Sequence, residues 1–326
     1  MGGDRAPDTM VDGAVAAARH LDAEILLVGA ADRIEAALLP HGHAGRQRVR
    51  VVDAPDVVEM TDAPAAALRR KPRASIRVAA ECVARGEAVA LVSAGHTGAS
   101  VMASYSAFGT LAGVDRPALA TTIPTRLSPA VLLDAGASVE CRPQHLLQFA
   151  IMGGVYARVA LGVGRPRVGL LSIGEEANKG NELTREAHRL LKQSPVHFVG
   201  NVEGREIYSG VADVIVCDGF TGNIVLKTSE GLVETVESLL HDELSATFGT
   251  RVGYLLSRQA YRRFRKRLDY SEYGGAPLVG LNGLCIVGHG RSSPKAVRNA
   301  VAMAARGVSE RLLDNLAREL SAHAQL

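Results

Sequence analysis

Six short segments rich in glycine, asparagine, aspartate and threonine have the composition of an anion-binding site. Glycine lets backbone N–H groups approach a ligand closely, and a helix that starts after such a segment carries partial positive charge at its N-terminus. The segments therefore predict a phosphate or oxyanion site along one edge of a sheet, and the alternative is that they are structural turns alone. They are Ser93–Ser100, Leu132–Ser138, Leu171–Glu182, Asn201–Glu206, Cys217–Asn223 and Val287–Ser293.

Lys179 and Asn223 are the two side chains that we expect to act directly in chemistry. The chain has 31 arginines but only six lysines, so a lysine in the polar run ANKGNE stands out. We interpret Lys179 as the cation that holds phosphate or a developing oxyanion, and Asn223 as an amide donor. The alternatives are a surface lysine at a helix start and an ordinary N-cap asparagine.

Asp218 is the third catalytic candidate, because it stands at the end of an apolar run and directly before Gly219. Its carboxylate could orient Lys179 or remove a proton from H₂PO₄⁻, and the alternative is a turn-forming aspartate. We interpret its neighbour Cys217 as a buried thiol at the end of a strand rather than as a nucleophile.

The remaining phosphate-binding candidates lie in the same segments and at the start of the chain. They offer close-approaching backbone, hydroxyl groups or amides, and we expect His96 to donate a hydrogen bond to phosphate with a charge that varies near neutral pH. These candidates are Gly3, Asp4, His96, Thr97, Gly98, Gly174, Glu175, Asn178, Gly219, Thr221 and Gly222.

Three common catalytic motifs are missing from the sequence. Gly162-Val-Gly164 continues with Arg-Pro-Arg, so it is no dinucleotide-binding fingerprint, and GEEANKG lacks the hydroxyl residue after the lysine of a P-loop. A GxSxG elbow is also missing, which argues against a serine hydrolase.

Predicted strands and helices alternate along nearly the whole chain. These elements would hold the glycine-rich loops in position. Runs such as VALVSAG and DVIVCDG are apolar throughout, as in parallel strands covered on both faces. We predict a doubly wound α/β/α sandwich with a mostly parallel sheet, forming one catalytic domain over residues 1–326 or two lobes of it. The predicted strands are Glu24–Val28, Arg48–Val52, Ala88–Ser93, Pro117–Ile123, Ala130–Asp134, Arg167–Ile173, His197–Gly200, Asp213–Asp218 and Leu284–Gly288. The longer predicted helices are Pro143–Leu161, Glu182–Lys192, Asn223–Leu244 and Pro294–Ala322.

Composition excludes several classes of protein. With 326 residues, 47% hydrophobic content and a net charge of +3, the chain can bury a full core and is not disordered. The small net charge and 4% aromatic content argue against nucleic-acid binding. The four cysteines and ten histidines are dispersed, which argues against a disulfide framework or a metal site. Without a long apolar run or a signal-peptide pattern, we expect a cytoplasmic protein.

Seven blocks of sequence, in order from Met1 to about Ser293, resemble the PlsX family of bacterial phosphate acyltransferases. The blocks are Met1–Pro7, Ser93–Ala99, Leu132–Gly153, Ile173–Gly180, Asn201–Ile207, Ala212–Lys227 and Tyr273–Gly283. The resemblance implies transfer of a fatty acyl group from acyl carrier protein to inorganic phosphate, early in phospholipid synthesis. It also implies a fold related to isocitrate dehydrogenase and phosphotransacetylase, a homodimer, and no metal or nucleotide cofactor.

The sequence departs from that family in two places. Family members usually carry a short strand before MGGD, whereas this sequence starts at Met1. Either the start was assigned late or the strand is absent, and an absent strand would leave the first glycine-rich turn less firmly held. His96 also stands where the family usually has asparagine.

A basic amphipathic segment at Phe248–Leu268 is predicted to form a helical insertion within residues 245–272. Its apolar residues recur at helical spacing among many cations, a profile typical of an anchor at an anionic membrane surface. The same cations suit acyl carrier protein, which is strongly acidic, and the alternative is a solvated helix pair that packs on a dimer partner. The predicted contact residues are Arg251, Arg258, Arg262, Arg263, Phe264, Arg265, Lys266 and Arg267.

Direct attack of phosphate on the thioester is the mechanism we expect, because phosphate is already a nucleophilic anion. Three rivals stay open: a phosphotransacetylase-like enzyme using short acyl-CoA, a nicotinamide-dependent decarboxylating dehydrogenase, and a membrane-bound scaffold that only docks carrier protein. The dehydrogenase would need clustered carboxylates for Mg²⁺, for which Glu175, Glu176 and Asp218 are a thin basis.

Overall fold

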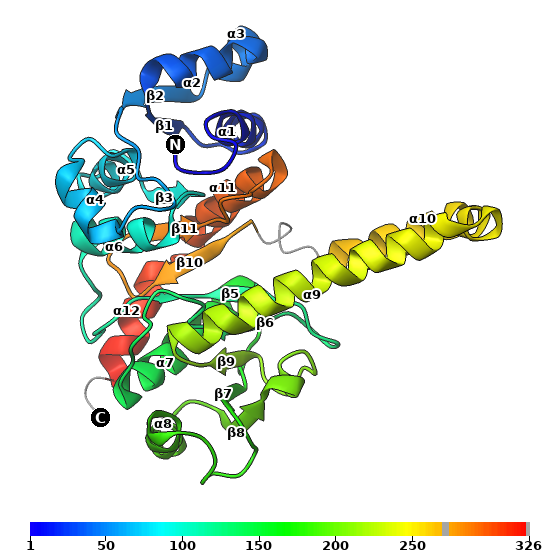
Figure 1. Ribbon diagram of the computed structural model, residues 1–326. Coiled ribbons are helices and arrows are strands. Elements are labelled where there is room, and N and C mark those ends of the chain that lie inside the picture. Colours follow the sequence, from blue (N-terminus) through cyan, green and yellow to red (C-terminus); the bar gives the residue numbers. More distant parts are fainter. Residues whose placement is uncertain (269–273, 324–326) are drawn as a thin grey trace.

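A computed structural model of the chain describes residues 1–268 and 274–323 (Figure 1). Two main sheets form its centre. The first has the order β3 (Ala90–Ser93), β11 (Leu284–Val287), β10 (Ala276–Val279) and β4 (Ala118–Leu119), and only its β3–β11 pair is parallel. The second has the order β5 (Thr121–Ile123), β6 (Ala130–Leu133), β9 (Val214–Val216), β7 (Val168–Ser172) and β8 (Phe198–Glu203), and all its strands but β5 are parallel.

A third, two-stranded parallel sheet joins β1 (Ile25–Gly29) to β2 (Val49–Asp53) at the N-terminal end of the molecule. A cavity of 540 Å³ lies between this sheet and the first main sheet, with residues of β1 and β3 among its lining. Both strands are edges of their own sheets, so the three sheets are not one continuous layer.

Helices cover the sheets on both sides, and the prediction of a doubly wound α/β fold is confirmed. Those of the N-terminal part are α1 (Asp8–His20), α2 (Ala31–Leu38), α3 (Gly42–Arg46), α4 (Pro64–Arg70), α5 (Ser75–Ala84) and α6 (Thr97–Phe108). The later helices are α7 (Pro143–Leu161), α8 (Glu182–Gln193), α9 (Gly219–Ala246), α10 (Phe248–Leu268), α11 (Pro294–Ser309) and α12 (Leu312–His323), and short 3₁₀ turns occur at Leu39–His41 and Gly204–Glu206.

One hydrophobic core extends across both main sheets, and α7 lies at its centre. Phe149 and Met152 of α7 are fully buried, and they belong to one cluster with Val216 of the second sheet and Ile286 of the first. Gly153 permits the close approach of α7, because a Cβ there would lie 2.5 Å from Cγ1 of Val214. The two sheets are thus packed on a shared helix.

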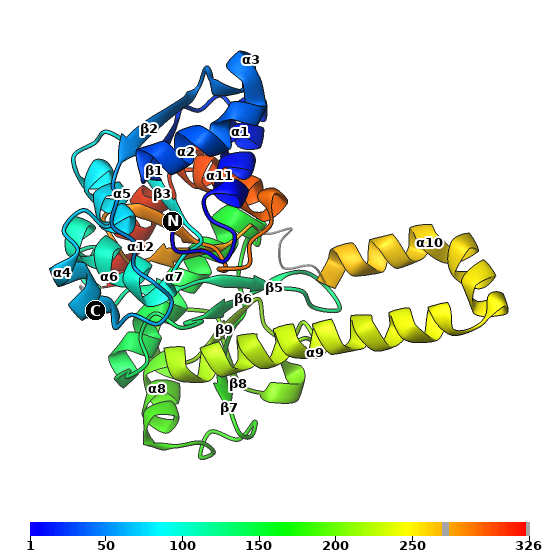
Figure 2. The same ribbon diagram turned by 45° about the horizontal axis from the view of Figure 1, so that its top comes forward.

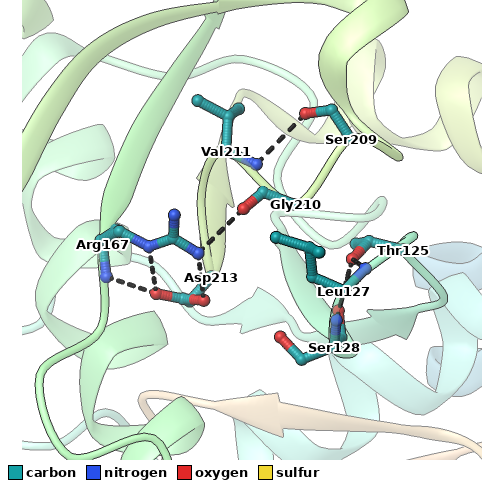
Figure 3. Close-up of polar contacts among 8 residues, drawn as sticks. All are labelled: Thr125, Leu127, Ser128, Arg167, Ser209, Gly210, Val211 and Asp213. Atoms are coloured by element: carbon teal, nitrogen blue, oxygen red, sulfur yellow. Dashed lines mark hydrogen bonds and ion pairs between the residues drawn. The ribbon is translucent and has the colours of Figure 1, made fainter.

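A polar cluster fixes the ends of the second sheet that lie away from the loops of interest (Figure 3). The Arg167 guanidinium donates to both carboxylate oxygens of Asp213 at 3.0 Å and to the Gly210 carbonyl at 2.8 Å. Burial raises the pKa of Asp213, but its hydrogen bonds from Arg167 outweigh that effect and lower the pKa. The pair ties the start of β7 to the start of β9.

Two predicted elements are divided in the structure, and one strand was not predicted. The predicted strand Pro117–Ile123 is two strands, because β4 pairs in the first sheet and β5 in the second. The predicted helix Pro294–Ala322 is broken at Arg311, whose φ of +52° is left-handed. The strand β10, in the run YGGAPLVG, is the one that was not predicted.

Candidate active site

The glycine-rich segments follow strands of two sheets, which corrects the expectation of a single sheet edge. Four of them follow the parallel strands β6, β7, β8 and β9 of the second sheet, whose carboxyl ends share one edge. The other two follow β3 and β11 of the first sheet. Ligands in open α/β folds bind at such carboxyl ends, so two edges contribute to the site.

Contacts of α9 with α6 and with the loop after β11 bring the two groups of loops together. Leu226 of α9 packs in one cluster with Val101 of α6 and with Ala135 and Ala137 of the loop after β6. His289, in the loop after β11, lies 3.7 Å from the Glu230 carboxylate of α9. The N-terminal turns of α6 and α9 therefore border the same region.

The first glycine-rich turn of the chain packs against the loops of the first sheet. The Asp4 N–H donates to the Gly290 carbonyl at 3.0 Å, and a Cβ on Gly3 would lie 2.8 Å from the Ala94 carbonyl oxygen. Glycine is thus required at position 3 by close backbone contact, and the exposed Asp4 side chain lies beside the same loops.

His96 caps α6, and both of its ring nitrogens are occupied. Nδ1 accepts a hydrogen bond from the Ala99 N–H at 3.4 Å, so the proton is on Nε2, which lies 3.2 Å from the Asp62 carbonyl. Donation from His96 to phosphate would require Nε2 to leave the Asp62 carbonyl, and this role of His96 stays a prediction. The first residues of α6, Thr97 and Gly98, are half-buried at the positive end of that helix.

Asp134 organises the loop after β6, although the sequence analysis did not select it. Its Oδ1 accepts hydrogen bonds from the N–H groups of Leu119, Gly136 and Ala137 at 2.8 to 3.0 Å, and its Oδ2 from Ser138 at 2.6 Å. Burial raises its pKa to about 6, against the opposing effect of these four donors. Three N–H groups of the Leu132–Ser138 segment thus bind this carboxylate rather than an external anion. The sequence DAG was the signal for this role, because an aspartate side chain in a turn often accepts a hydrogen bond from the backbone N–H two residues later.

Asp218 is the N-cap of α9. Its carboxylate accepts hydrogen bonds from the Thr221 N–H at 2.8 Å and the Thr221 hydroxyl at 2.7 Å. The alternative reading of Asn223 as the N-cap is therefore wrong, because the helix starts four residues earlier, at Gly219. Among the described residues, no hydrogen bond or ion pair joins Asp218 to Lys179.

The first turn of α9 lies directly on the Asp134 loop, and its glycines make this possible. A Cβ on Gly222 would lie 1.9 Å from the Asp134 carbonyl oxygen, and one on Gly219 would lie 2.6 Å from the Ser138 carbonyl oxygen. Asn223 is exposed, and its Oδ1 would contact a Cβ on Gly136 at 3.4 Å. The Asn223 amide thus lies at the outer side of the Gly136 turn.

Lys179 lies in the loop after β7, the neighbour of β9, and its side chain is exposed. Its stem packs over Gly174, where a Cβ would lie 2.8 Å from the lysine Cγ. Within residues 1–268 and 274–323 its ammonium group has no hydrogen bond or ion pair. Glu175 and Asn178 are exposed in the same loop, and Glu175 lies 3.6 Å from Arg205.

The Cys217 thiol lies under this region and is fully protonated near neutral pH, because burial raises its pKa well above the ordinary value. It is 2% exposed and contacts the Asp134 carbonyl, as expected for a buried thiol. In the part of the chain that the structure describes, no three His, Cys, Asp or Glu side chains are grouped so as to hold a metal ion.

The predicted basic insertion is the second arm of a helical hairpin, formed by α9 and α10, that projects from the body (Figures 1 and 2). Arg265 lies 3.4 Å from Glu237 of α9, and Arg251 donates to the Ser245 carbonyl, so these two cations hold the arms together. The predicted cations that lie exposed on α10 without an ion pair among the described residues are Arg258, Arg262, Arg263, Lys266 and Arg267. Phe264 is 44% exposed and Leu256 is 83% exposed on the same helix. In the described part of the chain, no helix is both long and apolar enough to cross a membrane.

Residues 1–314 match a family model described as "Fatty acid synthesis protein". The chain is 49% identical over 320 residues to a phosphate acyltransferase of Geobacter sp. (strain M21), covering 97% of this chain and 91% of that one. It is 50% identical over 313 residues to the phosphate acyltransferase of Heliobacterium modesticaldum, covering 96% and 93%. Its fold resembles a phosphotransacetylase from Streptococcus pyogenes, with a TM-score of 0.59, 17% identity and 91% of each chain covered.

Proposed function

The chain belongs to the PlsX family of phosphate acyltransferases, and from that membership we propose that it transfers a fatty acyl group from acyl carrier protein to inorganic phosphate. It is an acyltransferase of fatty acid and lipid synthesis. The further proposal is that the donor is a long-chain acyl thioester of the carrier protein, and that acyl phosphate is the product.

One observation carries this proposal for the site. The exposed Asn223 amide on the first turn of α9 and the Lys179 ammonium follow two neighbouring strands, β9 and β7, of the same parallel sheet edge. The N-terminal turn of α6, with Thr97 and Gly98, borders the same region from the first sheet. A cation, an amide and a helix N-terminus are the groups that hold a phosphate and stabilise an oxyanion.

The proposed reaction is a direct displacement at the thioester carbonyl. A phosphate oxygen attacks the carbonyl carbon, the C–O bond forms, and the C–S bond breaks as the oxyanion collapses. The thiolate leaves and takes the proton that HPO₄²⁻ loses, so acyl phosphate and a free thiol are the products. No enzyme nucleophile is required, which agrees with the buried, protonated thiol of Cys217.

The candidate residues of α6, of α9 and of the lysine loop have defined parts in this proposal. Lys179 holds phosphate or the oxyanion, Asn223 donates its amide N–H to the same intermediate, and the α6 N-terminus positions phosphate. Asp218 acts by fixing the first turn of α9 through Thr221 rather than through Lys179. Gly219 and Gly222 allow that turn to sit on the Asp134 loop.

The test is phosphate-dependent release of free thiol from long-chain acyl-carrier protein, long-chain acyl-CoA and acetyl-CoA. We expect K179A and N223A each to lose about 10²–10³ in kcat, the usual cost of one oxyanion donor, while folding normally. Exposed Lys192 at the end of α8 supplies the matched control, K192A, which should keep its rate. C217S should also keep its rate.

Wild-type turnover in both K179A and N223A would remove this site assignment. Preference for acetyl-CoA would favour the phosphotransacetylase reading, and activity in cells unaffected by both substitutions would favour a scaffold. Binding of NAD(P)H would favour the dehydrogenase reading.

The α9–α10 hairpin is proposed to serve the apolar substrate and product. Its unpaired cations and exposed apolar side chains have the chemistry of a peripheral contact with an anionic leaflet on the cytoplasmic side, and acidic acyl carrier protein could use the same cations. The exposed Leu232, Val236 and Leu239 on α9 support a homodimer that packs along this arm, which sedimentation analysis would test.

A further inference from the structure

The turn that carries Lys179 is tied to the neighbouring strand by one buried side chain. Asn201 of β8 donates from Nδ2 to the Glu176 carbonyl at 2.9 Å, and the Lys179 N–H donates to the same carbonyl at 3.0 Å. Asn201 is only 9% exposed. The Glu176 carbonyl is therefore the point at which β8 holds the lysine backbone.

The orientation of the Asn201 amide follows from its two partners. A carbonyl can only accept, so the amide NH₂ must face Glu176 and the amide oxygen must face Nδ1 of His188, 2.9 Å away. That Nδ1 must therefore carry a proton. The His188 ring is held in turn by an edge-on contact with Phe198, with the ring centroids 5.0 Å apart. A chain of contacts runs from α8 through β8 to the turn.

The other polar side-chain contacts of the turn are exposed or lie at its edge. Arg185 donates to the Gly180 carbonyl at 3.0 Å, in an exposed hydrogen bond. The Glu175–Arg205 ion pair is 3.6 Å long between side chains that are 61% and 74% exposed, and such pairs contribute little. Asn181 accepts from the Thr184 N–H and so caps α8, but it does not bond the Glu176 carbonyl. Asn201 is thus the buried polar tie on the lysine side of the loop.

We propose that Asn201 is a positioning residue for Lys179 and that His188 fixes the orientation of its amide. This inference rests on the proposed function, in which Lys179 holds phosphate or the oxyanion. Removing the donated hydrogen bond frees the Glu176–Lys179 turn and displaces the ammonium group, and displacements of about 1 Å can cost about 10²-fold in rate.

The decisive variant is N201D, which keeps the shape of the side chain but replaces the donor facing Glu176 by an acceptor. We expect kcat/KM for phosphate to fall 10- to 100-fold, with KM for the acyl donor unchanged. N181D is the matched control, because aspartate caps α8 equally well, and it should keep its kinetics. A loss spread equally over both substrates would indicate general damage and overturn the inference.

His188 gives a second, more distant pair of variants. H188Q can still donate an N–H to the Asn201 oxygen, whereas H188L cannot, so H188L should lower kcat/KM for phosphate and H188Q should restore most of it. If N201D fails to fold by circular dichroism, this pair decides, and equal kinetics of the two would overturn the inference.

A readout independent of turnover is the acylation rate of Lys179 by an amine-reactive reagent, followed by mass spectrometry against Lys192. N201D should change the Lys179 rate several-fold and leave the Lys192 rate alone. Wild-type kinetics of N201D together with an impaired K179A would overturn the positioning role only. Wild-type kinetics of K179A would overturn the proposed site and this inference with it.

Discussion

Asp134 is a fully buried carboxylate beside the proposed site, and its charge is balanced by backbone donors alone. Such a group costs desolvation energy when it ionises, and hydrogen bonds repay only part of that cost. Burial accordingly raises its pKa to about 6. Its ionisation is therefore coupled to the folding of the loop on which α9 rests.

We expect Asp134 to make the stability of the protein depend on pH between about 4 and 6. An unfolded aspartate releases its proton near pH 4, whereas the folded protein keeps it up to about pH 6, so the folded state binds more protons in this window. The contribution of Asp134 to the unfolding free energy should therefore fall as pH rises through the window, by an amount on the order of 3 kcal/mol, and stay constant above it. Urea denaturation at pH 4.5, 5.5, 6.5 and 7.5 measures this.

D134N isolates the effect of this one group from other titrating residues. The amide cannot titrate, and its NH₂ would oppose the Ser138 N–H, so the variant should be less stable at every pH. The stability of the wild type minus that of D134N should shrink between pH 4.5 and 6.5. A difference that is the same at all four pH values would contradict the raised pKa.

Residue types made Lys179 and Asn223 candidates, because a lysine among arginines and an amide beside glycines are visible in the sequence. Asn201 was not predicted because its role depends on a partner far away in the chain. Asp134 was also not predicted, although three of its four donors lie within four residues of it and only Leu119 is distant. Leu119, which donates to Asp134, and Glu176, which accepts from Asn201, are 15 and 25 residues distant. The contact of His96 Nε2 with the Asp62 carbonyl could not be predicted for the same reason, since the two residues are 34 apart in the chain.

The start of α9 depends on an interface between the helix and the loop after β6 that leaves no room for a side chain. Gly222 meets the Asp134 carbonyl oxygen there, whereas an added Cβ on Gly231, nine residues further along the same helix, would have open space around it. The same substitution, glycine to alanine, should therefore have opposite effects on stability at the two positions.

G222A should lower the unfolding free energy by about 3 kcal/mol, because its Cβ would lie 1.9 Å from a backbone oxygen and the helix must shift away. G231A should raise the unfolding free energy by up to about 1 kcal/mol, since alanine favours an exposed helix interior over glycine. Denaturant titration of both variants measures the two effects. If G222A were as stable as G231A, α9 would not rest on the loop in this way.

Helices with a clear hydrophobic period or a clear end signal could be predicted from the sequence. Strands whose pairing depends on tertiary packing could not. The helix α7 has the predicted bounds, Pro143–Leu161, since proline begins it and Gly162 ends it in a left-handed conformation. The division of residues 117–123 between two sheets could not be read from an apolar run, because it depends on which strand lies alongside each half.

At the scale of the whole molecule, the proposed site lies between two sheets that share one core, and the hairpin extends outward from that same region. The helix α9 begins at the proposed site and continues without interruption into the projecting arm (Figure 2). A membrane or protein surface that binds the hairpin would therefore hold the proposed site at a fixed distance from that surface and in a fixed orientation.

Reversing two adjacent charges on α10 should weaken binding to anionic vesicles without changing catalysis. Arg262 and Arg263 are both exposed, and each cation near an anionic leaflet contributes about 1 kcal/mol, so R262E/R263E should bind about 30-fold more weakly or worse. Sedimentation with phosphatidylglycerol vesicles measures this, and wild-type binding should also fall with added salt. Release of thiol from a long-chain acyl-CoA without vesicles should keep its rate.

The matched control is R69E/R70E, which reverses an adjacent pair of exposed arginines at the end of α4, on the body of the molecule. Both variants change the net charge by the same amount, so a loss confined to R262E/R263E would locate the membrane contact on the hairpin. Equal losses would instead mean that only the overall charge matters. Unchanged binding of R262E/R263E would mean that α10 is not the membrane contact, and that its cations serve the carrier protein or a second subunit.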